Sequence, residues 1–337
     1  MYIENLAIHI VGNSNDDIVI TKKPITVSQD LNSLLCTYFY NSIVRNEAYS
    51  FFHENDIKYN EVYNIIADIF DTPNSLYDNS IMLANCLHRN STHHNIKQGE
   101  FYVVYFRDCE FKGRIADAIG LFKTENKETF LRIHNSDRSI DIEALDGINL
   151  RKIDKGAIIM NFNKGEGYHI SIIDNTNKGE DAKYWTDNFL HLKSVKDNFY
   201  NTHHALMMCK SFVKKGLPEQ FEVELADQAE ILNKSVAFFK AHDNFDMEEF
   251  ANEVIGQPEV IESFNQYRVA YEAEHEVQIA DEFVISDSAV KKQARSFKSV
   301  IKLDKNFHIY IHGDRKLIEQ GEDEKGKYYK VYFKEEL

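Results

Sequence analysis

The 337-residue sequence contains little that interrupts a regular chain, with only 4 Pro and 14 Gly. Collagen-like and wholly disordered classes are therefore excluded, and we expect long helices and strands. The 4 Cys lie far apart and form no Cys-x-x-Cys pair. This usage excludes a disulfide framework and is typical of a reduced, cytoplasmic protein with buried thiols.

Long apolar stretches are also missing. Apolar runs such as Ala157–Met160 fall far short of the roughly 20 residues that a membrane span needs. The first residues, Met1–Asn5, place no basic stretch before an apolar one, so they do not predict a secretory signal. We therefore expect no membrane partner.

Motifs for nucleotide binding and hydrolysis do not occur. The chain has no G-x-x-x-x-G-K-[ST], G-x-G-x-x-G, G-x-S-x-G or H-E-x-x-H string. Among the 14 His, the pairs His93–His94, His203–His204 and His308 with His312 lack Cys or carboxylate partners at ligand spacing. The sequence therefore predicts no cofactor and no metal site.

Charge is the most uneven property of the chain. The net charge is −15, and residues 219–287 alone hold 18 acidic against 3 basic residues. Residues 288–316 hold eight basic against two acidic residues, and Lys193–Lys215 contains five Lys with a single acidic residue. Such runs are commonly solvated helix faces, but a basic stretch can also bind several phosphates by charge.

Apolar spacing predicts the elements. A period of two predicts strands over 2–11, 101–106, 114–122, 129–134, 156–162, 168–173, 282–285, 299–303, 307–312 and 328–333. Helical spacing predicts helices over 28–43, 60–70, 73–88, 195–215, 218–241, 246–255, 258–276 and 288–295. Lys214-Lys215-Gly216 followed by Pro218 is typical of a helix that stops at the Gly.

The order of these elements favours an α+β fold. Short polar turns join successive strands, which favours an antiparallel sheet, and helices precede the strands instead of alternating with them. We predict an α+β domain over 1–192 with N-terminal helices and an antiparallel sheet. A helical middle region over 193–277 and a small β-rich C-terminal region over 278–337 follow.

The short basic helix is the sharpest functional signal. Arg295 follows Lys291 by four residues and Lys292 by three, so the three charges lie on neighbouring faces of the helix. The candidate DNA-binding residues are the cations of both basic stretches: Lys193, Lys196, Lys210, Lys214, Lys215, Lys291, Lys292, Arg295, Lys298 and Lys302. Because Lys dominates, we expect contacts to phosphate with little base readout.

Two other functions would use other residues of the chain. The acidic block 219–287 could dock a basic partner such as a DNA-handling protein, or mimic DNA, and it could also pair with the basic stretches of a second copy in a homodimer. A metal-dependent nuclease would instead use the carboxylates before Lys155, which are Asp137, Asp141, Glu143, Asp146 and Asp154. In Ile140–Glu143 the alternation would place two of these carboxylates on one strand face.

Several segments, taken in order, resemble one known family. Ile3–Val11 resembles its first strand, Gly99–Phe106 and Asn149–Asp154 its central sheet, Asp181–Leu190 the segment before its helices, Lys193–Phe212 its basic helix, and Asp246–Asp281 and Phe283–Arg295 its last helical and β units. The family is that of bacterial nucleoid-associated proteins of the NdpA/YejK type. This resemblance covers nearly the whole chain in spacing and length, and it implies a non-enzymatic, DNA-associated, dimeric protein of the cytoplasm and nucleoid. It implies no catalytic residues.

Overall fold

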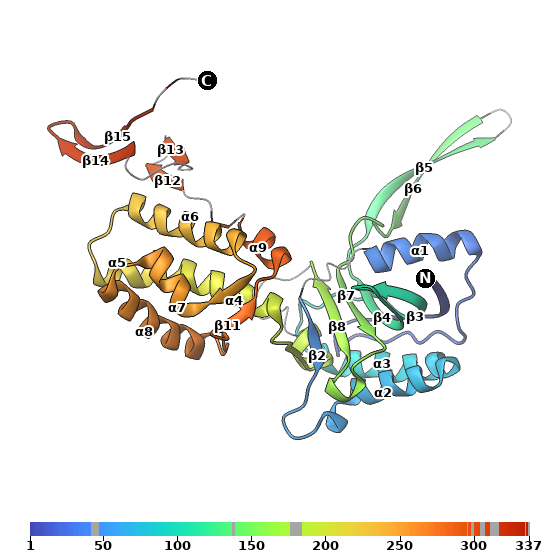
Figure 1. Cartoon of the computed structure of the whole chain (residues 1–337). Helices are drawn as coiled ribbons and strands as arrows, with labels where there is room; N and C mark the ends of the chain where they lie inside the picture. Colours follow the sequence, from blue (N-terminus) through green and yellow to red (C-terminus); the bar gives the residue numbers. More distant parts are fainter. Residues whose placement is uncertain are drawn as a thin grey trace. The chain divides into compact units, whose positions relative to one another are not determined.

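The chain forms two compact units, Met1–Val195 and Lys196–Leu337 (Figure 1). The computed structural model describes residues 1–41, 47–136, 139–175, 184–294, 296–297, 300–303, 307–310, 317–333 and 335. The first unit is built around a sheet and the second around helices. The predicted α+β class is therefore confirmed.

An antiparallel sheet of seven strands forms the centre of the first unit, in the order β1-β3-β4-β7-β8-β2-β9. The strands are β1 (Tyr2–Val11), β2 (Tyr49–Phe51), β3 (Gly99–Phe111), β4 (Arg114–Thr124), β7 (Lys155–Met160), β8 (His169–Asp174) and β9 (Leu192–Ser194). The predicted antiparallel arrangement is confirmed. Sequence periodicity missed β2 and β9 because three residues are too few to show an alternation.

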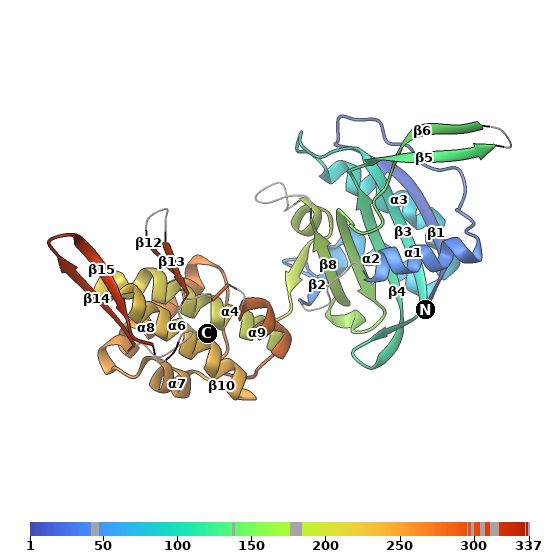
Figure 2. The ribbon, with the colours of Figure 1, turned by 90° about the horizontal axis from the view of Figure 1, so that it is seen from above.

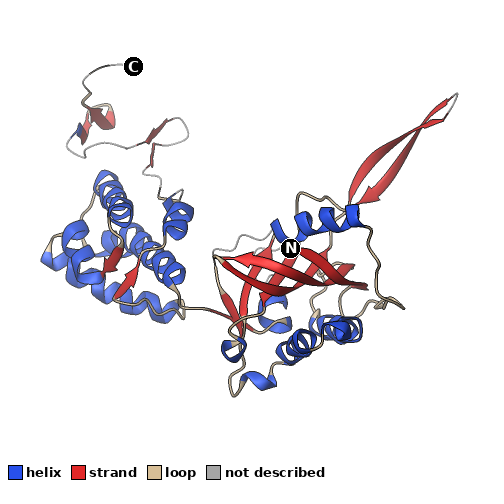
Figure 3. Cartoon of the chain, turned by 45° about the vertical axis from the view of Figure 1, so that its right-hand side comes forward, coloured by secondary structure: helices blue, strands red, loops and turns tan. Residues whose placement is uncertain are grey.

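Helices cover both faces of this sheet, as Figure 3 shows. The helices are α1 (Gln29–Asn41) on one face, and α2 (Glu61–Asp71) and α3 (Leu76–Asn90) on the other. In β3, odd-numbered residues from Phe101 to Tyr105 enter the core under α2 and α3, and even-numbered residues from Tyr102 to Phe106 enter the core under α1. A strand buried on both faces has an unbroken apolar sequence, which explains the run of aromatic and aliphatic residues there.

A separate ribbon projects from the first unit (Figure 1). Its strands, β5 (Glu128–Ser136) and β6 (Ser139–Gly147), form a two-stranded antiparallel sheet of their own. The alternating segment Ile140–Glu143 lies in β6.

The second unit packs helices around an aromatic core. They are α4 (Asn198–Ser211), α5 (Leu217–Gln220), α6 (Leu225–Ala241), α7 (Met247–Phe250), α8 (Pro258–Glu274) and α9 (Asp287–Ala294), with π-helical turns at Phe212–Gly216 and Ala251–Ile255. The core includes Phe212, Phe238, Phe245, Phe250 and Phe264. Two short strands, β10 (Asn244–Asp246) and β11 (Glu282–Val284), pair beside it.

Two small hairpins end the chain (Figure 2). The first joins β12 (Val300–Leu303) to β13 (Phe307–Tyr310), and the second joins β14 (Ile318–Asp323) to β15 (Gly326–Val331). Ile301 and Ile318 pack with Ala226 and Ala229 of α6. Sequence periodicity missed β14, in which Ile318 is the one large apolar residue.

The start of the predicted C-terminal region belongs to the helical core. Ile279, Ile285, Val290 and Phe297 are buried in the same cluster as apolar residues of α4, α6 and α8. The boundary between the units falls after Val195, three residues beyond the predicted end of the first region, and the second unit runs on through residues 278–337.

Gly216 does not stop a helix, contrary to the prediction. Its φ of −63° and ψ of −41° are right-handed helical, and the chain continues through α5 to Gln220. The Gly is needed for close packing, since a Cβ atom there would lie 2.5 Å from Cδ2 of Tyr267. The predicted helix 218–241 is interrupted at Phe221, and a capping box of Glu224 and Asp227 begins α6.

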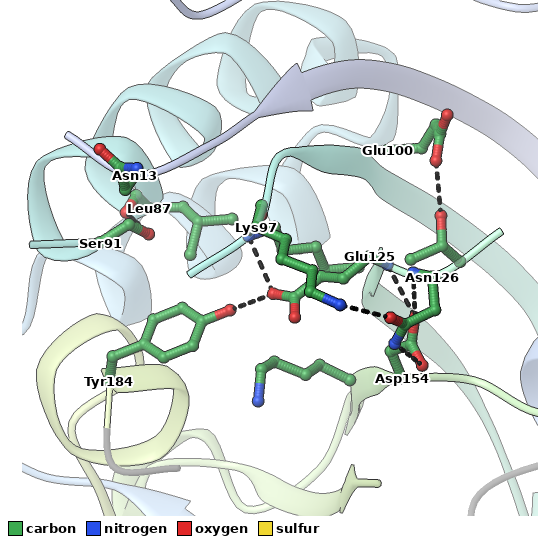
Figure 4. A network of polar contacts seen from close by, with 12 residues as sticks. Asn13, Leu87, Ser91, Lys97, Glu100, Glu125, Asn126, Asp154 and Tyr184 are labelled. Carbon is green, nitrogen blue, oxygen red and sulfur yellow. Dashed lines mark hydrogen bonds and ion pairs between the residues drawn. The ribbon is translucent and has the colours of Figure 1, made fainter. Parts of the chain in front are cut away.

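A buried ionic network holds one end of the sheet together (Figure 4). Lys123 and Lys155 are both fully buried and lie directly opposite each other on β4 and β7. The Lys123 Nζ lies 3.0 Å from Glu125 Oε1 and donates to the Lys97 carbonyl, while the Lys155 Nζ lies 2.5 Å from Asp174 Oδ2. Burial is the main cause that lowers the pKa of Lys123, and the charge of Glu125 opposes that shift.

Tyr184 completes the network from the π-helical segment Tyr184–Phe189, which lies between β8 and β9 in the chain. Its hydroxyl donates to Glu125 Oε1 at 2.8 Å, and its ring lies 5.6 Å from the Lys123 Nζ and 5.0 Å from the Lys155 Nζ. The two like charges on adjacent strands are therefore each paired with a carboxylate, and both lie near the same aromatic ring.

We predict that Glu125→Ala destabilises the first unit by about 3–5 kcal/mol, because it leaves the Lys123 ammonium buried without its carboxylate. Urea unfolding followed by fluorescence measures this, since Trp185 is the single Trp of the chain and is buried in the core of that unit. The exposed Glu54→Ala is the control and should change little. Equal midpoints for the two variants would contradict the assignment.

A second prediction concerns pH and His9, whose residue is 1% exposed. The Thr21 N–H donates to Nδ1 at 3.3 Å, and Nε2–H donates to Ser80 Oγ at 2.8 Å, since that hydroxyl donates to the Tyr77 carbonyl. These contacts fix a neutral ring, and burial lowers its pKa from 6.5 to about 4.

The contribution of the neutral His9 ring to the free energy of unfolding is fully present above pH 6.5. It is lost as the pH falls toward 4, because over this range the His9 ring takes up a proton in the unfolded chain but not in the folded one. The expected loss is about 3 kcal/mol. In urea titrations from pH 7 to pH 4, His9→Gln should flatten this dependence, whereas the exposed His94→Gln should preserve it.

Candidate nucleic-acid interface

The second unit packs the basic helix α9 against α4. Ala289, Val290 and Gln293 of α9 are buried, whereas Lys291 and Lys292, which lie between Val290 and Gln293, are exposed to water. The backbone N–H of Ser286 donates to Thr202 Oγ1 at 3.0 Å, and Gln293 Nε2 lies 2.7 Å from His203 Nδ1. The two segments, roughly 85 residues apart in sequence, are thereby fixed side by side.

Lysines from both segments lie along this packed pair. Lys291 and Lys292 are exposed on α9, and the Lys292 Nζ lies 5.8 Å from the ring centroid of Phe199 in the first turn of α4. At the last turn of α4, the Lys210 Nζ lies 5.7 Å from the ring of Phe297. The first and last turns of α4 are about 16 Å apart at 1.5 Å per residue, so the charges extend over the length of several phosphates.

Like charges meet at the end of α4. Burial lowers the pKa of Lys210, and the charge of Lys214 lowers it further. Lys214 and Lys215 are exposed in the π-helical turn that follows α4. Among the residues that the structure describes, Lys214, Lys215 and Lys291 form no ion pair with a carboxylate. A bound phosphate would relieve this repulsion.

The other predicted cations lie elsewhere. Lys193 belongs to β9 of the first unit, where its Nζ lies 4.8 Å from the Phe52 ring. The Lys196 Nζ donates to Gln278 Oε1 at 2.9 Å. Arg295 and Lys298 lie outside the described residues, and Lys302 lies in β12 with its side chain outside them.

Sequence reasoning missed the neutral side chains that support the lysines. Phe199 and Phe297 supply ring faces beside ammonium groups, and His203 joins α4 to α9 through Gln293. Counting charge finds only Lys and Arg, and the adjacent pair His203–His204 was considered only as a metal ligand. The basic surface therefore cannot be recognised from the sequence alone, because it depends on the packing of α4 against α9.

The carboxylates of the nuclease hypothesis occupy different surroundings. Asp141 and Glu143 lie on one face of the projecting ribbon, where Glu143 Oε2 is 3.1 Å from His134 Nε2. Asp154 is buried, and its oxygens accept from the N–H groups of Glu125 and Asn126 and from the Asn126 side chain at 2.7–3.1 Å. Asp146 accepts from the Thr129 hydroxyl, and Asp137 lies outside the described residues.

One group in the described chain has the donor types for a metal ion: His242, Glu249 and Glu253, with ligand atoms within 4.8 Å of one another. Nδ1 of His242 lies 3.0 Å from the Phe238 carbonyl, which leaves Nε2 facing Glu253 at 3.7 Å. The four-residue spacing of the two Glu was a signal in the sequence, but acidic pairs of this kind are frequent in the block 219–287.

We predict that Lys214→Gln raises the pKa of Lys210, because it removes the like charge that lowers it. The measurement is an NMR titration of the lysine side chains. Lys240→Gln, on α6, is the matched control and should leave that pKa unchanged. An unchanged titration in Lys214→Gln would mean that the two ammonium groups do not interact.

No described helix is long and apolar enough to cross a membrane.

Comparison with known proteins gives one result that covers most of the chain. A search of curated proteins finds no match. The family described as nucleoid-associated protein YejK matches residues 7–325, which takes in both compact units. On this match, which extends over most of its length, the chain belongs to the nucleoid-associated protein YejK family.

Proposed function

We propose that this protein is a non-enzymatic, nucleoid-associated DNA-binding protein that contacts phosphates and acts as a homodimer. The proposed contact is the α4–α9 surface, which we define as Lys210, Lys214, Lys215, Lys291 and Lys292. Membership of the nucleoid-associated family supports the general kind of function.

The observation that carries the proposal is the packing of α9 on α4. It joins two basic stretches that the sequence separates by the acidic block 219–287. The overall charge of −15 argues against DNA binding only if charge is averaged over the chain. Phosphates respond to the local field, which falls off within about 10 Å in 0.1 M salt.

The chemistry of the surface favours backbone contacts. All five groups are lysines, which bind phosphate as point charges, whereas guanine readout mostly uses the planar fork of Arg. We therefore expect sequence-tolerant binding. The non-enzymatic part of the proposal is supported by Asp154, whose carboxylate already accepts three hydrogen bonds, and by the separate placement of Asp141 and Glu143 on the ribbon.

A docking role is the second candidate, and the acidic block favours it. Its 18 acidic residues face only Lys234, Lys240 and Arg268 within the same stretch, and Arg268 pairs with Glu272 and Asp281. The stretch therefore keeps an excess of negative charge, which would attract a basic partner such as a DNA-handling protein.

The test is DNA binding by a variant with Lys214, Lys215, Lys291 and Lys292 all changed to Gln. Fluorescence anisotropy on duplex DNA of mixed sequence, over a series of salt concentrations, gives the slope of log K against log salt. That slope should fall by roughly 3.6, at about 0.9 for each phosphate contact removed. Each surface change should shift stability by no more than about 0.5 kcal/mol, so the circular dichroism melt should stay close to that of the parent.

The matched control changes four exposed lysines of the first unit, Lys22, Lys23, Lys58 and Lys112, to Gln. It alters net charge by the same amount and should keep the parental slope. Equal slopes in the two variants would contradict the α4–α9 surface. If the test variant binds DNA like the parent but loses a partner or dimer contact, the docking role would replace DNA binding.

A further inference from the structure

Over its outer part, one face of the β5–β6 ribbon carries a row of exposed apolar side chains, with Asn135 as the one polar residue among them. Cross-strand register pairs Leu131 with Ala144 and Ile133 with Ile142, and Ile140 lies opposite Asn135. The exposed fractions are 72% for Leu131, 67% for Ile133, 71% for Ile140 and 69% for Ile142. We call Leu131, Ile133, Ile140, Ile142 and Ala144 the ribbon face.

The opposite face of the same ribbon is polar over its outer half. Arg132 lies opposite Glu143, and His134 lies opposite Asp141, with His134 Nε2 3.1 Å from Glu143 Oε2. A ribbon whose two faces are both exposed to solvent would carry polar side chains on both faces. Here the side chains alternate between a polar face and an apolar face, which is the pattern of a sheet with its apolar face covered.

A two-stranded ribbon gains little stability in water by itself. Four large aliphatic side chains in a row, each about two-thirds exposed, also form an apolar patch of the kind that marks an interaction site. The ribbon therefore requires a partner surface over the ribbon face.

Charge argues against nucleic acid as that partner. The described residues of the ribbon include the acids Glu128, Asp141, Glu143 and Asp146, against Arg132 as the sole Lys or Arg among them. Phosphates would be repelled by such an element, and its aliphatic side chains offer them no hydrogen bond.

A second copy of the same face fits it well. The pair of Ile133 and Ile142 is the middle one of the three cross-strand pairs that make up the ribbon face. A two-fold axis that lies between two such faces, parallel to the line joining these two residues, would stack two ribbons face to face, with Leu131 and Ala144 of each against Asn135 and Ile140 of the other. Stacking would cover the eight large aliphatic side chains of the two faces and remove on the order of 1,000 Å² from water. This area reaches the lower bound of a specific interface.

We propose that the ribbon face is the dimer contact, made by the ribbons of two copies of this chain. The inference rests on the homodimer part of the proposed function and names a surface for it. It differs from a dimer held by the acidic block and the basic stretches, because apolar contact does not weaken with salt whereas ion pairs between exposed groups do.

The first experiment measures mass by sedimentation equilibrium on the full chain. Ile133→Gln with Ile142→Gln should raise the dimer dissociation constant by about 100-fold or more, since four isoleucines per dimer lose their apolar contact. The control makes the same change at the neighbouring cross-strand pair on the other face, Arg132→Gln with Glu143→Gln, and should keep the parental constant. Parental dimers should persist in 1 M NaCl.

The second experiment does not depend on affinity. The four natural cysteines, Cys36, Cys86, Cys109 and Cys209, are all buried and should react little. Ile133→Cys therefore introduces a thiol that is exposed when they are not. A short bismaleimide should cross-link this variant into dimers, and Arg132→Cys, on the opposite face, should stay monomeric on a denaturing gel.

The outcomes separate the two proposals. A parental protein that is monomeric at 50 µM would overturn the homodimer itself, and the ribbon contact with it. A dimer that survives the Ile variant, or dissociates in 1 M NaCl, would overturn the ribbon contact and leave a charged interface. Dissociation in the Ile variant alone, together with cross-linking at position 133 alone, supports the ribbon face.

Discussion

The packing of α9 on α4 is the interaction on which the functional surface depends. Ala289 and Val290 bury the apolar side of α9, and the contacts from Ser286 to Thr202 and from Gln293 to His203 fix its position along α4. Without this contact the chain would have two separate basic stretches and a strongly acidic block between them. With it, lysines from both stretches line one packed helix pair.

The protein handles buried and exposed lysines in opposite ways. In the first unit, Lys123 and Lys155 are buried opposite each other, and each is matched by a carboxylate within 3.0 Å. In the second unit, Lys214 lowers the pKa of Lys210, and neither lies in an ion pair within the described chain. The first arrangement satisfies its own charge and stabilises a fold, whereas the second leaves positive charge for a ligand.

The sequence predicted most of the elements with long, periodic patterns. The apolar run of β3 predicted a strand of the sheet, and helical spacing predicted α2 and α9. Short strands such as β9 escaped because three residues carry no period. Gly216 was misread as a helix stop because the ring that requires a Gly there belongs to Tyr267 of α8, which is 51 residues later in the sequence. For the site, charge counting found the lysines, but only tertiary packing shows that Lys210 and Lys292 lie beside Phe297 and Phe199.

The central claim is that the lysines of α4, its π-helical end and α9 act as one phosphate-binding surface. Lysine acetylation footprinting of the parental protein, read by mass spectrometry with and without duplex DNA, tests it most directly. The account predicts that DNA protects Lys214, Lys215, Lys291 and Lys292 together at the same DNA concentration, while Lys22 and Lys23 of the first unit stay reactive. Protection of one stretch without the other, or uniform protection of lysines across both units, would contradict it.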